Sequence, residues 1–222
     1  IKENEIVLDI GGWFSPFNRA NWVIDFMPYE TRAKGGAKGP AKEYFTKETW
    51  IQRDLCDRKP LPFKNKEIDF IICSHTLEDV RDPIFVCSEI CRVGKRGYIE
   101  APSLISELSF VASKHYVGYS HHRWIIEIMN NKVTFFFKPH FLHCRWKYHF
   151  PRSYSRNLKT EQHIQWLFWE GSFQFEEDIA YCHAPHDKIE QFIRSQHVYP
   201  NYRYRIEKFR ESIKKVRDKF RI

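Results

Sequence analysis

The chain has 222 residues, of which 42% are hydrophobic, and this composition suits one α/β domain with a full core rather than two domains. The sequence contains no repeat, no low-complexity tract and no apolar run long enough to span a bilayer. Its formal net charge is +8, but residues 201–222 contribute +6 of this through nine basic and three acidic residues. The remaining charge does not favour nucleic-acid binding by the main domain.

The six cysteines are scattered and form no Cys-x-x-Cys motif. Isolated cysteines behave as small hydrophobic residues, whereas disulfide frameworks belong to oxidising compartments. We therefore expect a cytoplasmic protein whose cysteines stay reduced.

The first predicted strand covers residues 6–10 and is followed by Gly11 and Gly12. Its apolar run does not alternate, which is typical of a strand buried on both faces of a parallel sheet. A glycine pair at this point either ends the strand or lets a ligand pack against the backbone. Bulky Trp13 and Phe14 stand where a dinucleotide motif has glycine. A cofactor that binds without a pyrophosphate cradle, such as S-adenosylmethionine, is therefore favoured.

The second predicted strand, 22–24, ends at Asp25. A carboxylate at a strand end can accept both ribose hydroxyls, and Phe26 or Met27 can offer an apolar face to adenine. Taken alone, an aspartate that caps a helix or a turn is the commoner explanation. The connection between the first two strands is too short for a full crossover helix. Residues 31–43, rich in Gly and Lys, predict a surface loop.

Three more strands are predicted, at residues 49–54, 68–74 and 96–102. A helix precedes the last of them and begins after Asp82 and Pro83, an aspartate cap with a proline in the first turn. Its apolar residues recur at i, i+3 and i+4, and Gly94 ends it.

Five segments occur in an order and at spacings that resemble one family. They are Val7-Leu-Asp-Ile-Gly-Gly12; Asp25; Asp54 ahead of Leu61-Pro-Phe63; Ile68-Asp-Phe-Ile-Ile-Cys-Ser-His-Thr-Leu-Glu-Asp-Val80; and Glu89-Ile-Cys-Arg-Val-Gly-Lys-Arg-Gly-Tyr-Ile-Glu-Ala-Pro102. Together they resemble the class I S-adenosylmethionine-dependent methyltransferases, in the branch with Leu-Glu-His-(Val/Leu) and Glu-Ile-x-Arg-Val signatures. The resemblance covers residues 5–103. It departs from the pattern at Trp13 and Phe14, where the family often has small residues, and at Asp79, where it usually has histidine.

The resemblance implies which residues hold S-adenosylmethionine. The methionine end would lie on the loop formed by Asp9, Gly11 and Gly12, with Asp9 near the amino group. The ribose hydroxyls would bind Asp25, beside Phe26 and Met27, and the adenine would meet Asp54 and the backbone of Leu55. The residues nearest the reactive methyl group would be Cys73, Ser74 and His75.

The second half predicts the acceptor side of the protein. Residues 103–113 suit one helix, residues 121–128 and 132–138 a β-hairpin about Asn130-Asn131, and residues 165–170 and 173–175 a second hairpin about Gly171. Most of the many aromatic residues here are expected in the core, and a few in an acceptor pocket. Residues 201–222 predict a basic amphipathic helix, which either docks on the domain through its apolar stripe or offers a surface to a partner.

Histidines are concentrated after residue 114, and only His75 precedes it. His121 and His122, together with His75, are candidate bases for removing a proton from an acceptor, although a strand-end hydrogen bond explains either member of the pair equally well. Two runs have spacings that suit a metal, His140-x-x-His143-Cys144 and His183-x-x-His186-Asp187. Neither indicates a fourth ligand, and methyl transfer from a sulfonium needs no Lewis acid, so we expect no metal.

We therefore predict a Rossmann-like α/β fold with a doubly wound, mostly parallel sheet, helices on both faces, a truncated first crossover helix and extra β-hairpins in the C-terminal half. Residues 1–200 would form the methyltransferase domain, with a cofactor half (1–103) and a substrate-side half (104–200), and residues 201–222 the C-terminal helix. The predicted activity is methyl transfer from S-adenosylmethionine to an oxygen or nitrogen of a small molecule, such as a sugar, a lipid precursor or a secondary metabolite. The alternatives are an RNA or protein methyltransferase and a non-catalytic binding module of the same fold.

Overall fold

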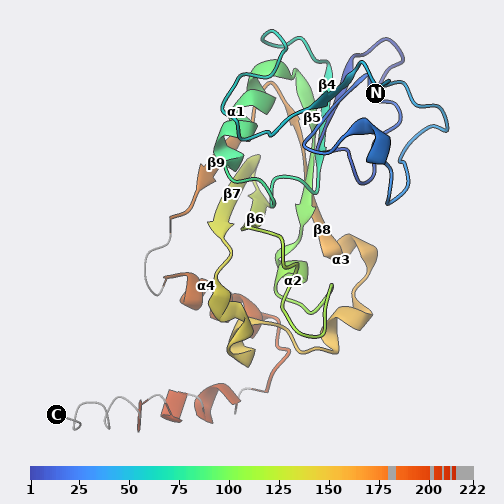
Figure 1. Ribbon diagram of the computed structural model, residues 1–222. Helices are drawn as coiled ribbons and strands as arrows, with labels where there is room; N and C mark the ends of the chain where they lie inside the picture. The colour runs from blue at the N-terminus through green and yellow to red at the C-terminus, as the bar shows by residue number, and fades with distance from the viewer. Residues whose placement is uncertain (180–183, 201–202, 207, 211, 214–222) are drawn as a thin grey trace.

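The computed structural model describes residues 1–179, 184–200, 203–206, 208–210 and 212–213. Its main sheet has six strands in the order β3-β2-β1-β4-β5-β8 (Figure 1). The first five run parallel and the last is antiparallel to β5. The strands are β1 (Val7–Ile10), β2 (Trp22–Asp25), β3 (Trp50–Gln52), β4 (Phe70–Ser74), β5 (Arg96–Pro102) and β8 (Ile164–Glu170). The predicted mostly parallel α/β sheet is confirmed.

One face of this sheet is covered by helix α1 (Pro83–Val93). Asp82 caps the helix by accepting a hydrogen bond from the backbone N–H of Phe85 at 3.0 Å, and Gly94 ends it, as predicted. The apolar side of α1 packs against alternate residues of the central strands. This core joins Val86, Cys87, Ile90 and Val93 of the helix to Leu8, Ile10, Ile71, Cys73 and Ile99 of the sheet.

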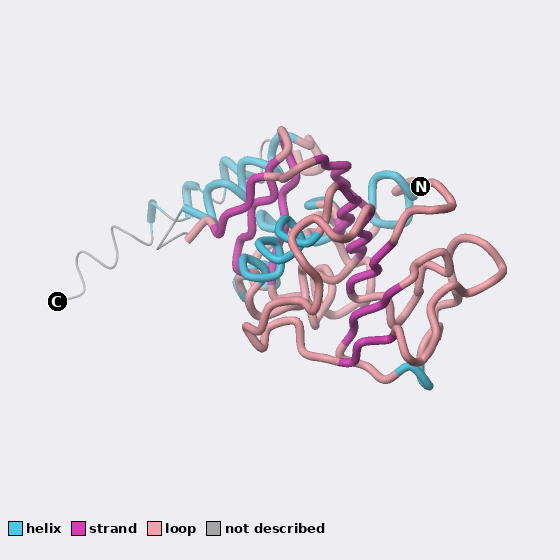
Figure 2. Tube along the Cα trace, turned by 90° about the horizontal axis from the view of Figure 1, so that it is seen from above, coloured by secondary structure: helices cyan, strands magenta, loops and turns pink. Residues whose placement is uncertain are grey.

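The opposite face is covered by loops, and the prediction of helices on both faces is wrong in this respect. The connections 11–21 and 26–49 contain no α-helix, only the short 3₁₀ turn η1 (Tyr29–Thr31), and Figure 2 shows them as loops. The first is too short for a crossover helix, as predicted, and the second is rich in Gly and Lys. Aromatic side chains take the place of helices here, and they include Trp13, Phe17, Tyr29, Phe45 and Trp50.

A second sheet of three strands lies beside α1 and extends the same core. It contains β6 (Trp124–Met129), β7 (Lys132–Phe137) and β9 (Gln174–Glu177). The hairpin β6–β7 is confirmed, and both turn residues, Asn130 and Asn131, have positive φ angles of 52° and 58°. These are the angles of a two-residue turn whose twist matches that of the strands.

The second predicted hairpin, about Gly171, is wrong. Its two arms belong to different sheets: β8 joins β5 at the edge of the main sheet, whereas β9 pairs in parallel with β7. The chain turns at Gly171, which has a φ of 71° and whose N–H donates to the carbonyl of Lys95 at 2.8 Å. A turn signal in the sequence does not tell whether the two strands beside it pair with each other or join different sheets. The partner of each strand is selected by the packing of the whole chain.

The remaining elements lie below the sheets, and all of them except α3 contribute to a second core. They are α2 (Leu104–Glu107), η2 (His140–His143), η3 (Trp146–Tyr148), η4 (Tyr154–Asn157), α3 (Thr160–His163) and α4 (Ala184–Ser195). The helix predicted for residues 103–113 is only the single turn α2, which ends at Leu108. After this turn the chain leaves the helical path, and the Leu108 carbonyl accepts a hydrogen bond from the N–H of Phe150 at 2.8 Å.

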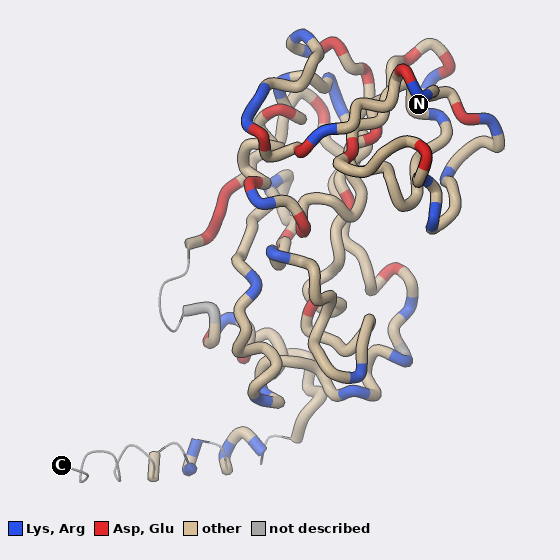
Figure 3. Tube along the Cα trace, in the orientation of Figure 1, with Lys and Arg blue, Asp and Glu red and all other residues tan. Residues whose placement is uncertain are grey.

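The predicted C-terminal helix is present in the described residues 203–206, 208–210 and 212–213, and Figure 3 shows its basic residues there. Tyr204 packs on Trp146. In contrast, Ile206, Phe209 and Ile213 are all exposed, so the described part of the apolar stripe does not dock on the domain as we expected first. The rest of the predicted helix lies outside the described residues.

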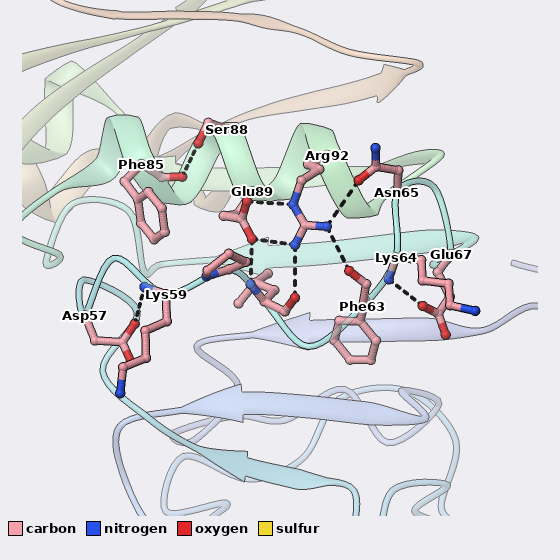
Figure 4. A network of polar contacts seen from close by, with 12 residues as sticks. Asp57, Lys59, Phe63, Lys64, Asn65, Glu67, Phe85, Ser88, Glu89 and Arg92 are labelled. Atoms are coloured by element: carbon pink, nitrogen blue, oxygen red, sulfur yellow. Dashed lines mark hydrogen bonds and ion pairs between the residues drawn. The ribbon is translucent and has the colours of Figure 1, made fainter.

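A partly buried ion pair on α1 fixes the loop that follows β3 (Figure 4). Glu89 and Arg92 pair at 2.7 Å, Glu89 Oε2 accepts from the N–H of Leu61 at 2.6 Å, and Arg92 donates to the carbonyls of Leu61 and Phe63 at 3.0 and 2.8 Å. The two sequence segments Leu61-Pro-Phe63 and Glu89-Ile-Cys-Arg92 thus belong to one structural unit. No described helix is long and apolar enough to cross a membrane.

Candidate functional site

A cavity of about 1290 Å³ opens where the parallel strands end. Its first wall, here called the cofactor wall, comes from the segments after β1, β2 and β3. Its second wall, here called the acceptor wall, comes from residues 74–81 after β4, Tyr98 and Glu100 of β5, and residues 119–123 ahead of β6. Open α/β sheets bind ligands in the crevice at the carboxyl ends of their strands.

Asp9 lies under the first loop of the cofactor wall. It is 3% exposed, and its Oδ2 accepts from the N–H of Phe17 at 2.8 Å. Burial raises the pKa of Asp9 to about 7, although the hydrogen bond from Phe17 opposes this. The Asp9 carboxylate therefore fixes the loop from beneath through this hydrogen bond. Only a small part of its surface is exposed to contact a ligand amino group.

Gly11 and Gly12 are required by the atoms of the protein itself. Gly11 has a φ of 78°, and a Cβ added there would lie 1.9 Å from Oγ1 of Thr76. A Cβ on Gly12 would lie 2.4 Å from the Asp9 carboxylate. Both residues line the cavity, and their contact with a ligand stays a prediction. The structure gives a reason for both glycines, because the loop is packed tightly on the residues beneath it.

Asp25 shapes the loop as well as facing the cavity. Its Oδ2 accepts from the N–H of Trp13 at 3.0 Å and its Oδ1 from the N–H of Met27 at 2.8 Å. Burial raises its pKa, against the effect of these hydrogen bonds. Each oxygen keeps a second lone pair for a ribose hydroxyl. Phe26 is 68% exposed and lines the cavity. Met27 does not line the cavity, and its backbone N–H binds Asp25.

Asp54 and Leu55 lie at the end of the cofactor wall, as predicted for an adenine site. Asp54 Oδ1 accepts from the N–H of Cys56 at 2.8 Å, and its Oδ2 pairs with Arg81 at 2.5 Å. Both partners of this ion pair are well exposed, so the pair contributes little stability and can open for a ligand.

Cys73 was predicted near the reactive methyl group, and this is wrong for its side chain. The thiol is fully buried in the core shared with α1, on the face of the sheet away from the cavity, and burial raises its pKa. The reason is strand alternation: consecutive residues of β4 point to opposite faces, so Ser74 lines the cavity and Cys73 cannot.

His75 lies in the middle of the acceptor wall with an unusual backbone φ of 53°. Its Nδ1 is 3.3 Å from Glu78 Oε1 and its Nε2 is 3.3 Å from Glu100 Oε1. Burial lowers the pKa of His75, but the hydrogen bonds to Glu100 and Glu78 outweigh it and raise the pKa to about 9. The bond from His75 lowers the pKa of Glu100 to about 2. At neutral pH this imidazole is already protonated, which argues against a role as base.

His121 and His122 reach the same wall from the loop before β6. The His122 Nδ1 lies 2.5 Å from Glu107 Oε1, and the other oxygen of Glu107 pairs with Lys138 at 2.6 Å. Glu107 is 1% exposed. The tautomer with a proton on Nδ1 satisfies this buried carboxylate, so Nε2 carries the lone pair. Tyr119 stacks on the His122 ring with centroids 4.5 Å apart.

The sequence did not single out four residues of the acceptor wall, Thr76, Tyr98, Glu100 and Tyr119, or the buried Glu107 that pairs with His122. They are spread over the chain and match no motif. Asp79 was noted only because it replaces the usual histidine of the family. One signal was present, because Glu100 follows two positions after Tyr98 on a predicted strand and therefore shares its face.

The two metal-like spacings do not form clusters of three donors in the described residues. The His143 Nδ1 accepts a hydrogen bond from the N–H of Val117 at 3.0 Å. Cys144 is exposed and belongs to no group of three metal donors in the described part of the chain. His186 stacks on Phe141 with centroids 3.6 Å apart, and His183 lies outside the described residues.

The cofactor wall fits the S-adenosylmethionine predicted from the sequence. The cavity is larger than the roughly 300–1,000 Å³ of most small-ligand pockets, which leaves room for a cofactor and an acceptor together. Its carboxylates follow the strand ends in the order needed for amino, ribose and adenine groups, and the exposed ring of Phe26 supplies an apolar surface. No cradle for a pyrophosphate is formed by the helix after β1, because the described chain has no helix there.

Comparison with known proteins finds one family model and several solved structures that this chain resembles. Residues 22–99 match a family model described as a methyltransferase domain. Among solved structures, similar chains are an S-adenosylmethionine dependent methyltransferase from Mesorhizobium loti (18% identity over 61% of this chain and 58% of that one, TM-score 0.36), the YcgJ protein from Bacillus subtilis (20%, 46% and 46%, 0.30) and a SAM dependent methyltransferase from Aquifex aeolicus (16%, 46% and 58%, 0.30). The chain thus aligns with about half the length of these proteins. Comparison with curated proteins finds no match.

Proposed function

Because residues 22–99 match a family model described as a methyltransferase domain, we propose that the chain is an S-adenosylmethionine-dependent methyltransferase that transfers a methyl group to an oxygen or nitrogen of a small molecule. The observation that supports this most is that two unlike walls face one cavity of about 1290 Å³. The cofactor wall offers carboxylates at the strand ends, and the acceptor wall offers aromatic rings and imidazoles. A small acceptor can lie between them within reach of both.

The charges around the cavity favour a small molecule over RNA. The acidic residues that line it, Asp9, Asp25, Asp54, Asp79 and Glu100, outnumber the cationic ones, which are Lys38, Arg81, Arg123 and the protonated His75. One of these basic residues, Arg81, is already paired with Asp54. A groove that follows a nucleic-acid backbone needs the opposite balance, because phosphates bind through lysine and arginine.

When bound, S-adenosylmethionine supplies an electrophilic methyl group on a sulfonium. Asp25 would hold its ribose while keeping the loop closed through the N–H groups of Trp13 and Met27. Phe26 would cover the adenine, and Asp54 would accept from the adenine amine after release of Arg81. Holding the reacting atoms aligned in a dry site supplies much of the rate in such a reaction, so these residues need only bind and orient.

On the acceptor wall, His75 and Glu100 form an ion pair that would orient the acceptor rather than take its proton. Ser74 Oγ and the Tyr98 hydroxyl both donate to Glu100 and keep it in place. His121 and His122 are the remaining groups that would govern the proton of the acceptor, and Glu107 fixes the ring of His122.

Calorimetric titration of the full chain with S-adenosylmethionine, and separately with S-adenosylhomocysteine, tests the proposal first. We expect micromolar binding with the product bound at least as tightly as the substrate. Transfer of a radiolabelled methyl group to pooled hydroxyl and amine compounds then identifies the acceptor. A folded chain that binds neither compound would contradict the proposal and favour a binding module. Labelling of RNA or protein but of no small molecule would contradict the acceptor class.

A further inference from the structure

We propose that Asp79, His121 and His122 bind a divalent transition-metal ion on the acceptor wall. Each of the three side chains offers one ligand atom, and these atoms lie within 4.8 Å of one another. The ligands of a tetrahedral Zn²⁺ lie about 3.4 Å apart when each is about 2.1 Å from the ion. Small side-chain rotations would therefore close the three around one ion. This is the single such group of three in the described part of the chain.

The donor types indicate the class of ion. Two imidazole nitrogens and one carboxylate oxygen suit Zn²⁺, Fe²⁺ or Co²⁺, whereas Mg²⁺ and Ca²⁺ prefer sites built from oxygen ligands alone. Three protein ligands are also the number found in catalytic zinc sites, which keep a further position open. All three residues line the cavity, so that open position would face the acceptor.

A built outer shell holds His122 in the orientation that a metal ligand needs. Its Nδ1 lies 2.5 Å from Glu107, which leaves Nε2 free to coordinate. Lys138 holds the other oxygen of Glu107 at 2.6 Å and also donates to the carbonyl of Tyr119 at 2.8 Å. Metal-binding histidines nearly always donate their second ring N–H to a carboxylate or carbonyl in this way. A histidine that served only to end a strand would not need a buried carboxylate and lysine behind it.

Asp79 carries an oxygen that the protein leaves unused. Its Oδ1 is buried and has no hydrogen-bond partner within the described residues. Buried carboxylate oxygens without a partner are costly, and a bound ion would remove the cost.

Backbone hydrogen bonds hold the ligands together although they come from distant segments. The carbonyl of Glu78 accepts from the N–H groups of Arg123 and Trp124 at 2.7 and 3.1 Å. The Arg123 Nε donates to the Asp79 carbonyl at 3.1 Å, and the Trp124 indole donates to the Val80 carbonyl at 2.8 Å. Residues 78–80 and 121–124 are therefore locked side by side, and the three donors meet because of this docking.

The role of the ion rests on the proposed function. An ion at this position would hold an acceptor oxygen at its open position and ease the loss of its proton to solvent, as metals do for bound water. That role would replace a free imidazole base. It would also restrict acceptors to molecules with a hydroxyl, best with a second oxygen beside it.

Metal binding is tested on the full chain after removal of metals with a chelator. Equilibrium dialysis against Zn²⁺ alone, followed by elemental analysis, should give one ion per chain. Co²⁺ alone should give a visible absorption band from its ligand field. Both readouts are independent of activity, and the titration with S-adenosylmethionine remains a separate measurement. Ion binding without cofactor binding would support the metal site and contradict the proposed function alone.

Single variants assign the site. His121→Ala is the main test because His121 is exposed and its loss should not affect folding. His121→Ala and Asp79→Ala should each weaken Zn²⁺ binding about 100-fold or more, and Glu107→Gln about 10- to 100-fold. The matched control is His140→Ala, an exposed histidine away from the cavity, which should bind as the wild type does. Unchanged affinity in both His121→Ala and Asp79→Ala, or no binding by the folded wild type, would overturn the proposal.

Discussion

The two walls of the cavity treat their carboxylates in opposite ways. On the cofactor wall, Asp9 and Asp25 accept hydrogen bonds from backbone N–H groups of nearby loops, and burial raises the pKa of both. On the acceptor wall, Glu100 pairs with His75, which lowers its pKa to about 2, and Glu107 pairs with His122 and Lys138. One wall is built from local turns and the other from ion pairs between distant segments. The carboxylates of the first wall are held by neutral backbone donors, whereas the second wall holds fixed charges of both signs.

The pH dependence of stability tests the first wall and has the largest expected effect. Because the folded pKa of Asp9 is about 7 and its unfolded value is about 3.8, the folded state keeps a proton that the unfolded state loses between these values. The free energy of unfolding should therefore fall as pH rises from about 4 to about 7, by up to about 4 kcal/mol. Denaturant titrations at several pH values measure this slope.

Asp9→Asn should remove this part of the slope, because the amide is neutral at every pH and still offers an oxygen to the N–H of Phe17. The control Asp187→Asn, at an exposed position of α4, should keep the wild-type profile. If Asp9→Asn retained the full slope between pH 4 and 7, the buried carboxyl would not be its source.

Loss of the second carboxylate of this wall should affect ligand binding more than folding. Asp25→Ala removes the proposed ribose acceptor and the partner of two N–H groups, so affinity for S-adenosylmethionine should fall about 100-fold, or about 2.7 kcal/mol. Calorimetry measures the affinity, and circular dichroism checks that the fold remains. Asp54→Ala, at an exposed position, should weaken binding less. Near-normal affinity in Asp25→Ala would show that the ribose binds elsewhere.

The acceptor wall should respond in the opposite part of the pH range, with a smaller effect. His75 has a folded pKa of about 9 against an ordinary value of 6.5, so the stability it contributes is complete below about pH 6.5 and is lost as pH rises through about 9. Its side chain is 43% exposed, and solvent screening reduces the effect. His75→Gln should flatten the unfolding free energy between pH 6.5 and 9 and leave cofactor affinity unchanged. A wild-type slope in this variant would contradict the ion pair with Glu100.

The sequence placed the carboxylates of the cofactor wall around the cavity because each lies in or near the end of a strand, whereas their binding of a ligand stays a prediction. Asp9, Asp25 and Asp54 stand at the ends of apolar runs, and parallel strands bring their carboxyl ends to one edge. The same reasoning failed at Cys73, where the position in the chain was right but the direction of the side chain depends on the phase of the strand. It also failed for the second face of the sheet, where aromatic loops take the place of helices.

The sequence by itself determined the strands of the parallel sheet, helix α1 with its cap and the acids of the cofactor wall, because buried runs, caps and strand ends are local patterns. Only the tertiary structure decided that β8 and β9 belong to different sheets, that His75 lies between Glu78 and Glu100, and that Asp79 meets His121 and His122. His75 and Glu100 are 25 positions apart in the sequence, and Asp79 and His121 are 42 positions apart. Their partners are selected by packing and by the need to pair buried polar groups, and neither is encoded in the spacing of any one segment.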